Sequence, residues 1–63
     1  MDQMIENIIN GNLEDAKKQA KRFKVGAIYD AMLFDFGWSK NKAHYGAMWV
    51  KGLADWQTFC DAQ

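Results

Sequence analysis

The stretch VGAIYDAMLFDFGWSKNKAHYGAMWVKG, residues 25–52, holds two helical patterns that meet at a glycine. In the first pattern, about residues 27–36, apolar side chains cover most of the helix circumference, and only Asp30 and Asp35 interrupt them. A helix that is apolar on most sides is usually buried on most sides. We therefore expect this helix to be the central element of the fold.

The second pattern, about residues 40–51, is bounded by residues that favour helix termini. Gly37 ends the preceding helix, and Ser39 is placed to cap the new one with its hydroxyl. Gly52 follows where a helix end often needs a left-handed residue, and Leu53 can fold back over the last turn. One face suits a close helix crossing because its residues are small or short: Ala43, Gly46, Ala47 and Val50.

Three further amphipathic segments flank this stretch. Two precede it, about residues 2–10 and 13–24, and the short loop between them favours an antiparallel helical hairpin, with Asn12 as N-cap of its second helix. The third follows it, about residues 54–61, with Asp55 in its first turn. Helical spacing predicts their inward side chains, which are Met1, Met4, Ile5, Ile8 and Ile9, then Leu13, Ala16, Ala20 and Phe23, then Leu53, Trp56, Phe59 and Cys60.

Length and composition limit the chain to one small domain of 63 residues. The predicted fold is all-α, a compact five-helix domain in which an N-terminal hairpin, residues 1–24, packs on a three-helix core, residues 25–63. Cys60 is the single cysteine and cannot close an intrachain disulfide. His44 has no companion at metal-ligand spacing, so we expect neither a metal nor a cofactor.

The charges balance in number but are unevenly distributed. Eight acids match eight bases, which argues against a simple polyanion binder. Five bases nevertheless follow one another without an acid, and we call them the basic stripe: Lys17, Lys18, Lys21, Arg22 and Lys24. The stripe is interpreted either as the solvated face of an amphipathic helix or as a face that binds an anionic or acidic partner.

The chain also carries more aromatic residues than a small core readily buries. Nine residues are Phe, Tyr or Trp, and three of them, Phe34, Tyr45 and Trp49, fall off the main apolar helix faces. They are either buried by a second layer of helices or exposed as a binding patch, because Trp and Tyr dominate interface energetics. The expected partner-binding residues are Trp38, Tyr45, Trp49, Lys42 and Phe34.

A helix-turn-helix DNA reader is one alternative for the region around Gly37. In that motif the second helix enters the major groove. Here Lys40, Asn41, Lys42 and His44 would open that helix, and these residue types suit phosphates and base edges. Leu33 is larger than the motif prefers, and the nearby aspartates would repel phosphates.

A helix–glycine–aromatic–serine pattern in the same region indicates another possibility. It continues with an alanine four residues after the serine and with aromatic residues in the last helix. The residues concerned are Phe36, Gly37, Trp38, Ser39, Ala43, Trp56 and Phe59.

With this pattern, residues 27–60 resemble a ubiquitin-associated domain, a three-helix module. Phe36 stands where that family commonly has methionine, and residues 1–24 lie outside the resemblance. The resemblance implies that Gly37, Trp38 and the final helix contact a partner protein.

The expected function is binding without catalysis. Ser39 is explained as a helix cap, His44 has no neighbouring acid in the sequence, and no glycine-rich phosphate loop occurs. We expect a small protein-interaction module that binds and modulates or inhibits a larger protein. The alternatives are a nucleic-acid binder that uses residues 40–51 and the basic stripe, and a structural homo-oligomer.

The general character of the chain also resembles small phage-encoded accessory proteins, which implies a host protein as the partner. No apolar run reaches membrane-spanning length, and the first residues do not form a secretory signal. The expected location is therefore the cytoplasm, which is the host cytoplasm for a phage-encoded protein.

Overall fold

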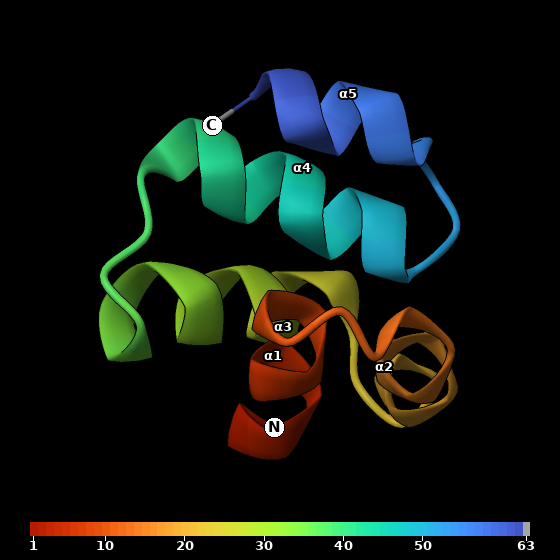
Figure 1. Ribbon diagram of the computed structural model, residues 1–63. Helices are drawn as coiled ribbons and strands as arrows, with labels where there is room; N and C mark the ends of the chain where they lie inside the picture. The colour runs from red at the N-terminus through yellow and green to blue at the C-terminus, as the bar shows by residue number, and fades with distance from the viewer. Residues whose placement is uncertain (63) are drawn as a thin grey trace.

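The computed structural model describes residues 1–62, and this part of the chain contains helices and turns but no strand. The predicted all-α, five-helix fold is confirmed (Figure 1). A π-helical segment, η1, continues the third helix directly. The elements are α1 (Asp2–Ile9), α2 (Leu13–Ala20), α3 (Val25–Asp30), η1 (Ala31–Asp35), α4 (Lys40–Val50) and α5 (Trp56–Asp61).

Helix α4 is the central element, so the prediction that residues 27–36 occupy this place is wrong. Helix α4 packs against α3 and η1 on one side and against α5 on the other, and it also contacts α2. Figure 1 shows α4 lying between α3 and α5. The third helical segment is instead open to solvent along part of its length, where the side chain of Phe34 is 75 % exposed.

At Gly46 the neighbours of α4 come very close to its backbone. A Cβ atom on Gly46 would lie 3.0 Å from a ring carbon of Phe59, 3.1 Å from the sulfur of Met32 and 3.2 Å from a ring carbon of Trp38. These three side chains come from α5, η1 and the loop before α4. The small-residue face predicted for α4 is therefore a real packing surface, and Ala43, Gly46 and Ala47 are buried in it.

The first two helices pack on each other but are not antiparallel as expected. In Figure 1 α1 runs upward from the N-terminus while α2 is seen nearly end-on, so the two helices cross. The chain turns at Gly11, whose φ is +84°, and the N–H of Asn12 donates a hydrogen bond to the carbonyl of Asn7 at 2.8 Å. This left-handed C-cap redirects the chain sharply after α1.

The side chain of Asn7 joins the two crossing helices. It is buried, accepts a hydrogen bond from Gln3 Nε2 at 3.2 Å and donates one to Gln19 Oε1 at 2.9 Å. A buried amide is costly unless its hydrogen bonds are satisfied, and here its donor and its acceptor both have partners. Asn7 therefore fixes where α2 lies on α1.

The predicted termini of α4 are confirmed in the backbone. Ser39 Oγ accepts a hydrogen bond from the N–H of Lys42 at 3.1 Å. At the other end Gly52 has a φ of +78°, and the N–H of Leu53 donates to the carbonyl of Met48 at 2.8 Å. The Leu53 side chain is nevertheless 61 % exposed, so the expected inward position of this residue is wrong.

The end of α2 changes the geometry of the basic stripe. Helix α2 ends at Ala20, so Lys21 and Arg22 lie in the following turn and Lys24 is the N-cap residue of α3. Asn12 occupies the N-cap position of α2, but its side chain makes no capping hydrogen bond, contrary to expectation. The stripe is therefore spread over a helix, a turn and a cap.

The π-helical segment accounts for the exposure of Phe34. The N–H of Trp38 donates to the carbonyl of Met32 at 3.0 Å, and Gly37 between them has a φ of +68°. A π-helical turn holds more residues than an α-helical turn, so it shifts the side chains that follow it around the axis. Phe34 is turned outward, and Trp38 is brought back over α4.

Helix α5 begins one residue after Asp55, which is its N-cap and not a first-turn residue as expected. Asp55 Oδ1 accepts hydrogen bonds from Thr58 Oγ1 at 2.7 Å and from the N–H of Thr58 at 2.8 Å. These two bonds, the side-chain bond first, hold the pKa of the Asp55 carboxyl below its ordinary value. The ionised cap therefore fixes the start of α5.

The Asp55 cap should make the free energy of unfolding decrease as the pH falls into the acid range. The folded pKa of Asp55 is the lowered one, so its contribution is present at neutral pH and is lost as pH falls through that pKa. We predict that Asp55→Ala is less stable than the wild type at neutral pH and that the difference narrows in acid. Urea unfolding midpoints along a pH series measure this, and a constant difference at all pH values would contradict it.

Candidate functional site

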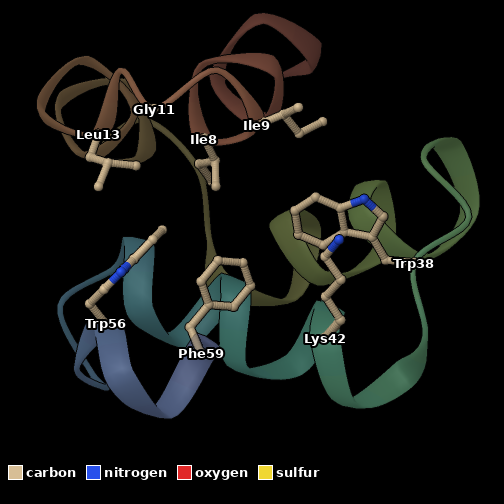
Figure 2. A pocket seen from close by; sticks show the side chains of 8 residues that line it. All are labelled: Ile8, Ile9, Gly11, Leu13, Trp38, Lys42, Trp56 and Phe59. Carbon is tan, nitrogen blue, oxygen red and sulfur yellow. The ribbon is translucent and has the colours of Figure 1, made fainter. Parts of the chain in front are cut away.

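An apolar groove of about 350 Å³ lies between the end of α1 and the helices α4 and α5 (Figure 2). One wall comes from α1 and the loop that leads into α2, and the other comes from Trp38, α4 and α5. All but two of the lining residues are large and apolar, and the two exceptions are Gly11 and Lys42. The apolar ones are Ile8, Ile9, Leu13, Trp38, Trp56 and Phe59.

The rims of the groove expose two of these apolar side chains to solvent. Ile9, the last residue of α1, is 58 % exposed, and Trp56, the first residue of α5, is 41 % exposed. They are far apart in the sequence but line the same depression. Scattered apolar residues on a surface need no explanation, whereas a contiguous set around a concavity is typical of a binding site.

Four aromatic rings form a continuous cluster behind and within the wall. Trp38 stacks on Phe59 with ring centroids 6.1 Å apart, and Phe59 meets Trp56 edge to face at 5.4 Å. The ring of Trp49 contacts both Trp56 and Phe59, with its centroid 4.7 Å from that of Trp56 and 5.9 Å from that of Phe59. Because Trp49 and Phe59 are buried, they hold the partly exposed rings of Trp38 and Trp56 in fixed positions.

A lysine lies against each end of this aromatic cluster. Lys42 Nζ is 4.2 Å from the centroid of the Trp38 ring, and Lys17 Nζ is 5.0 Å from the centroid of the Trp49 ring. Both distances fall within the range of cation–π attraction, which orients the two ammonium groups. Lys42 lines the groove itself, while Lys17 lies one helical turn beyond Leu13 on α2.

The structure places the predicted partner-binding residues in different environments. Trp38 and Lys42 line the groove. Tyr45 is half-buried and meets the ring of His44 at 4.7 Å, outside the groove, and the exposed Phe34 does not line the groove either. The structure therefore brings together two of the five residues.

Trp49 is only 4 % exposed, so of the two alternatives it is buried by a second layer of helices, and the expectation that it belongs to a partner-binding patch is wrong. That expectation assumed that α4 has one buried face. Because α4 packs against α3 on one side and α5 on the other, the face that carries Trp49 is covered by α5. Trp49 acts as a support for Trp56 and has no free surface of its own to offer a partner.

Helical spacing assigned Ile9, Leu13 and Trp56 to the core. Of these three, only Trp56 belongs to a segment, the last helix, that the resemblance implies as a partner contact. The available signal was the width of the apolar stripe on α1, which reaches Ile9 next to the terminating Gly11. A helix of eight residues that crosses its neighbour cannot bury the whole stripe against it. Part of the stripe is therefore left at the groove.

Only part of the basic stripe gathers at one place. Lys17 and Lys21 join Lys51, from the C-terminal end of α4, around a depression of about 180 Å³ that also includes Val50 and Gly52. We call this depression the lysine basin. Lys51 Nζ donates a hydrogen bond to the carbonyl of Ala20 at 3.0 Å. Sequence reasoning missed Lys51 because it lies far from the stripe in the chain.

The other three bases of the stripe, Lys18, Arg22 and Lys24, are exposed and do not line the lysine basin. Arg22 lies instead beside a depression at the start of α1, together with Gln19 and Phe23. The stripe is therefore not one continuous binding face.

Three further features of the described residues concern metal ligands, the single thiol and helix length. Residues 1–62 contain no group of three or more His, Cys, Asp or Glu side chains that could hold a metal ion. Cys60 is a free, half-buried thiol on α5. Over the same range, no helix has the length and apolar character needed to cross a membrane.

Comparisons of this chain with protein-family models, with curated proteins and with solved structures found no match.

Truncating the buried and the exposed tryptophan should have different effects on stability. Removing a fully buried Trp side chain costs about 3–5 kcal/mol, which is comparable to the whole stability of so small a domain. We predict that Trp49→Ala largely unfolds the protein, whereas Trp56→Ala stays folded and loses about 1–2 kcal/mol, because its ring is partly solvated already. Far-UV circular dichroism with urea titration distinguishes the two, and equal losses would contradict the assignment.

Proposed function

We propose that this protein is a non-catalytic interaction module that binds a larger protein through the apolar groove and thereby modulates or inhibits it. The observation that carries the proposal is the convergence of Ile9 and Trp56, two exposed apolar side chains from opposite ends of the chain, on one groove.

The aromatic cluster makes the groove suitable for binding. Trp56 packs against Trp49 and Phe59, and Trp38 packs against Phe59 and under Lys42. Side chains that are already held in position lose little conformational entropy when a partner arrives. Trp residues at the centre of an interface also contribute a large share of binding energy.

Steric blocking is the simplest way in which such a module modulates a larger protein, because it needs no chemistry of its own. The resemblance of residues 27–60 to ubiquitin-associated domains stays a prediction. Trp38 and Trp56 lie at positions that the resemblance implies as contacts, and both line the groove. A host protein as the target, as the resemblance to phage accessory proteins implies, also stays a prediction.

The nucleic-acid alternative has less support. Lys40, Asn41 and His44 are exposed on α4. However, Asp30 lines the same depression as His44, so a phosphate bound on this face of α4 would meet a carboxylate.

The chain offers a matched pair of variants for testing the groove. Ile9 and Leu53 are aliphatic side chains of nearly equal exposure, but only Ile9 lines the groove. We predict that wild type and Leu53→Ala recover the same stoichiometric protein partner from the cell of origin. Ile9→Ala should recover less of it than Leu53→Ala does. The double variant Ile9→Ala/Trp56→Ala should lose it, with affinity lowered about 30-fold or more, since interface hot spots contribute about 2 kcal/mol or more.

Quantitative affinity purification followed by titration with the recovered partner measures both effects, and circular dichroism verifies that each variant is folded. Equal loss with Leu53→Ala would contradict the groove as the binding site. Recovery of nucleic acid, with an affinity that falls steeply with salt, would favour the nucleic-acid alternative. A mass that increases with concentration in gel filtration would favour a homo-oligomer.

A further inference from the structure

We propose that the groove takes an acidic–apolar peptide segment, whose large apolar side chains fill the groove and whose carboxylates lie in the lysine basin. This inference rests on the proposed function and adds the chemistry of the partner to it. It is carried by three observations: the groove and the basin adjoin, the basin collects three lysines, and acidic residues border the groove at another side.

The groove and the lysine basin lie next to each other along α2. Leu13 lines the groove and Lys17 lines the basin, and the two lie one helical turn, about 5.4 Å of rise, apart on α2. Lys17 also lies over Trp49, whose ring contacts Trp56 in the groove. One short segment can therefore reach both depressions.

The lysine basin brings together three positive charges from α2, the turn after it and the end of α4. Its lining in the described part of the chain, which comprises Lys17, Lys21, Val50, Lys51 and Gly52, includes no carboxylate. Like charges that gather in one small depression repel one another, and a carboxylate placed among them relieves that repulsion.

Two of these lysines are held in place before any partner binds. The hydrogen bond from Lys51 Nζ to the Ala20 carbonyl and the position of Lys17 over Trp49 restrict both side chains. A restricted ammonium group loses less entropy on binding a carboxylate than a freely moving one.

Acidic residues near the groove exclude a uniformly negative partner. Glu14 and Asp15 line a depression that shares Gly11 and Leu13 with the groove. A nucleic-acid backbone laid along the groove would carry phosphates past these two carboxylates and would be repelled there. A peptide can carry its acidic residues at one end only. Its carboxylates can then lie among the lysines of the basin, away from Glu14 and Asp15.

Selection from a displayed library of random peptides tests this inference on the purified 63-residue chain. The library is selected in parallel on wild type, on Lys17→Glu/Lys21→Glu in the basin, and on Lys18→Glu/Lys24→Glu. The last pair is exposed, lies outside the basin and changes the net charge equally, so it is the matched control. The neutral pair Lys17→Gln/Lys21→Gln replaces the basin variant if charge reversal unfolds the protein.

We expect wild type and the control to select peptides that combine large apolar residues with Asp or Glu. The basin variant should keep the apolar preference and lose the acidic one. A selected peptide should bind the basin variant about tenfold more weakly than wild type, and the control nearly as well as wild type, because the lost contacts are local charge pairs. Its affinity should also fall with Trp56→Ala.

The outcomes separate this inference from the function on which it rests. Apolar peptides without an acidic preference, or equal losses in the basin variant and the control, would overturn the inference and leave the groove as a binding site. Selection that fails, or that yields peptides insensitive to Trp56→Ala, would overturn both.

Discussion

The rings of Phe59 and Trp38 and the thioether of Met32 close on the backbone of α4 at Gly46, where a side chain would leave too little room. This contact joins α5, the loop before α4 and η1 to the central helix in one place. Protein interiors are packed densely enough that even one added methylene group is felt by its neighbours. The positions of three elements therefore depend on the absence of a single Cβ atom.

The candidate binding groove depends on this same contact. Trp38 and Phe59 are packed at Gly46 and also form part of the groove wall. Phe59 in turn supports Trp56, which is backed by the buried Trp49. The crossing of α1 over α2, fixed by Asn7, places Ile9 on the opposite wall. The core packing and the candidate groove therefore share one aromatic cluster.

Local sequence signals predicted the helices and several of their ends, because caps act within a few residues. Ser39 and Gly52 are examples, since each bonds to its own helix terminus. What could not be predicted depends on which elements meet. Trp49 was misplaced because nothing in its own helix reveals that α5 covers it, and Lys51 joins Lys17 only through the contact of α4 with α2.

The π-helical segment could not be predicted from the sequence either. The pattern over residues 27–36 fits an ordinary α-helix. The structure has the wider turn there, and Trp38, which follows it, lies back over α4. Of the candidate site, Trp38 and Lys42 were found from their chemistry. Ile9 was not found, and Trp56 was indicated only by the resemblance, which implies the last helix as a contact. Helical spacing assigns both residues to the core, because the spacing within one helix does not show where the neighbouring helix ends.

Two glycine-to-alanine variants measure the importance of the Gly46 contact most directly. Both glycines are helical, but a Cβ on Gly26 meets nothing within 4 Å, whereas one on Gly46 meets three side chains. Gly26→Ala should raise the free energy of unfolding by about 0.5–1 kcal/mol through helix propensity. Gly46→Ala should lower it by about 1–2 kcal/mol, because overpacking costs more than propensity returns. If urea titration showed Gly46→Ala to be as stabilising as Gly26→Ala, the close packing on α4 would not be the constraint that holds this fold.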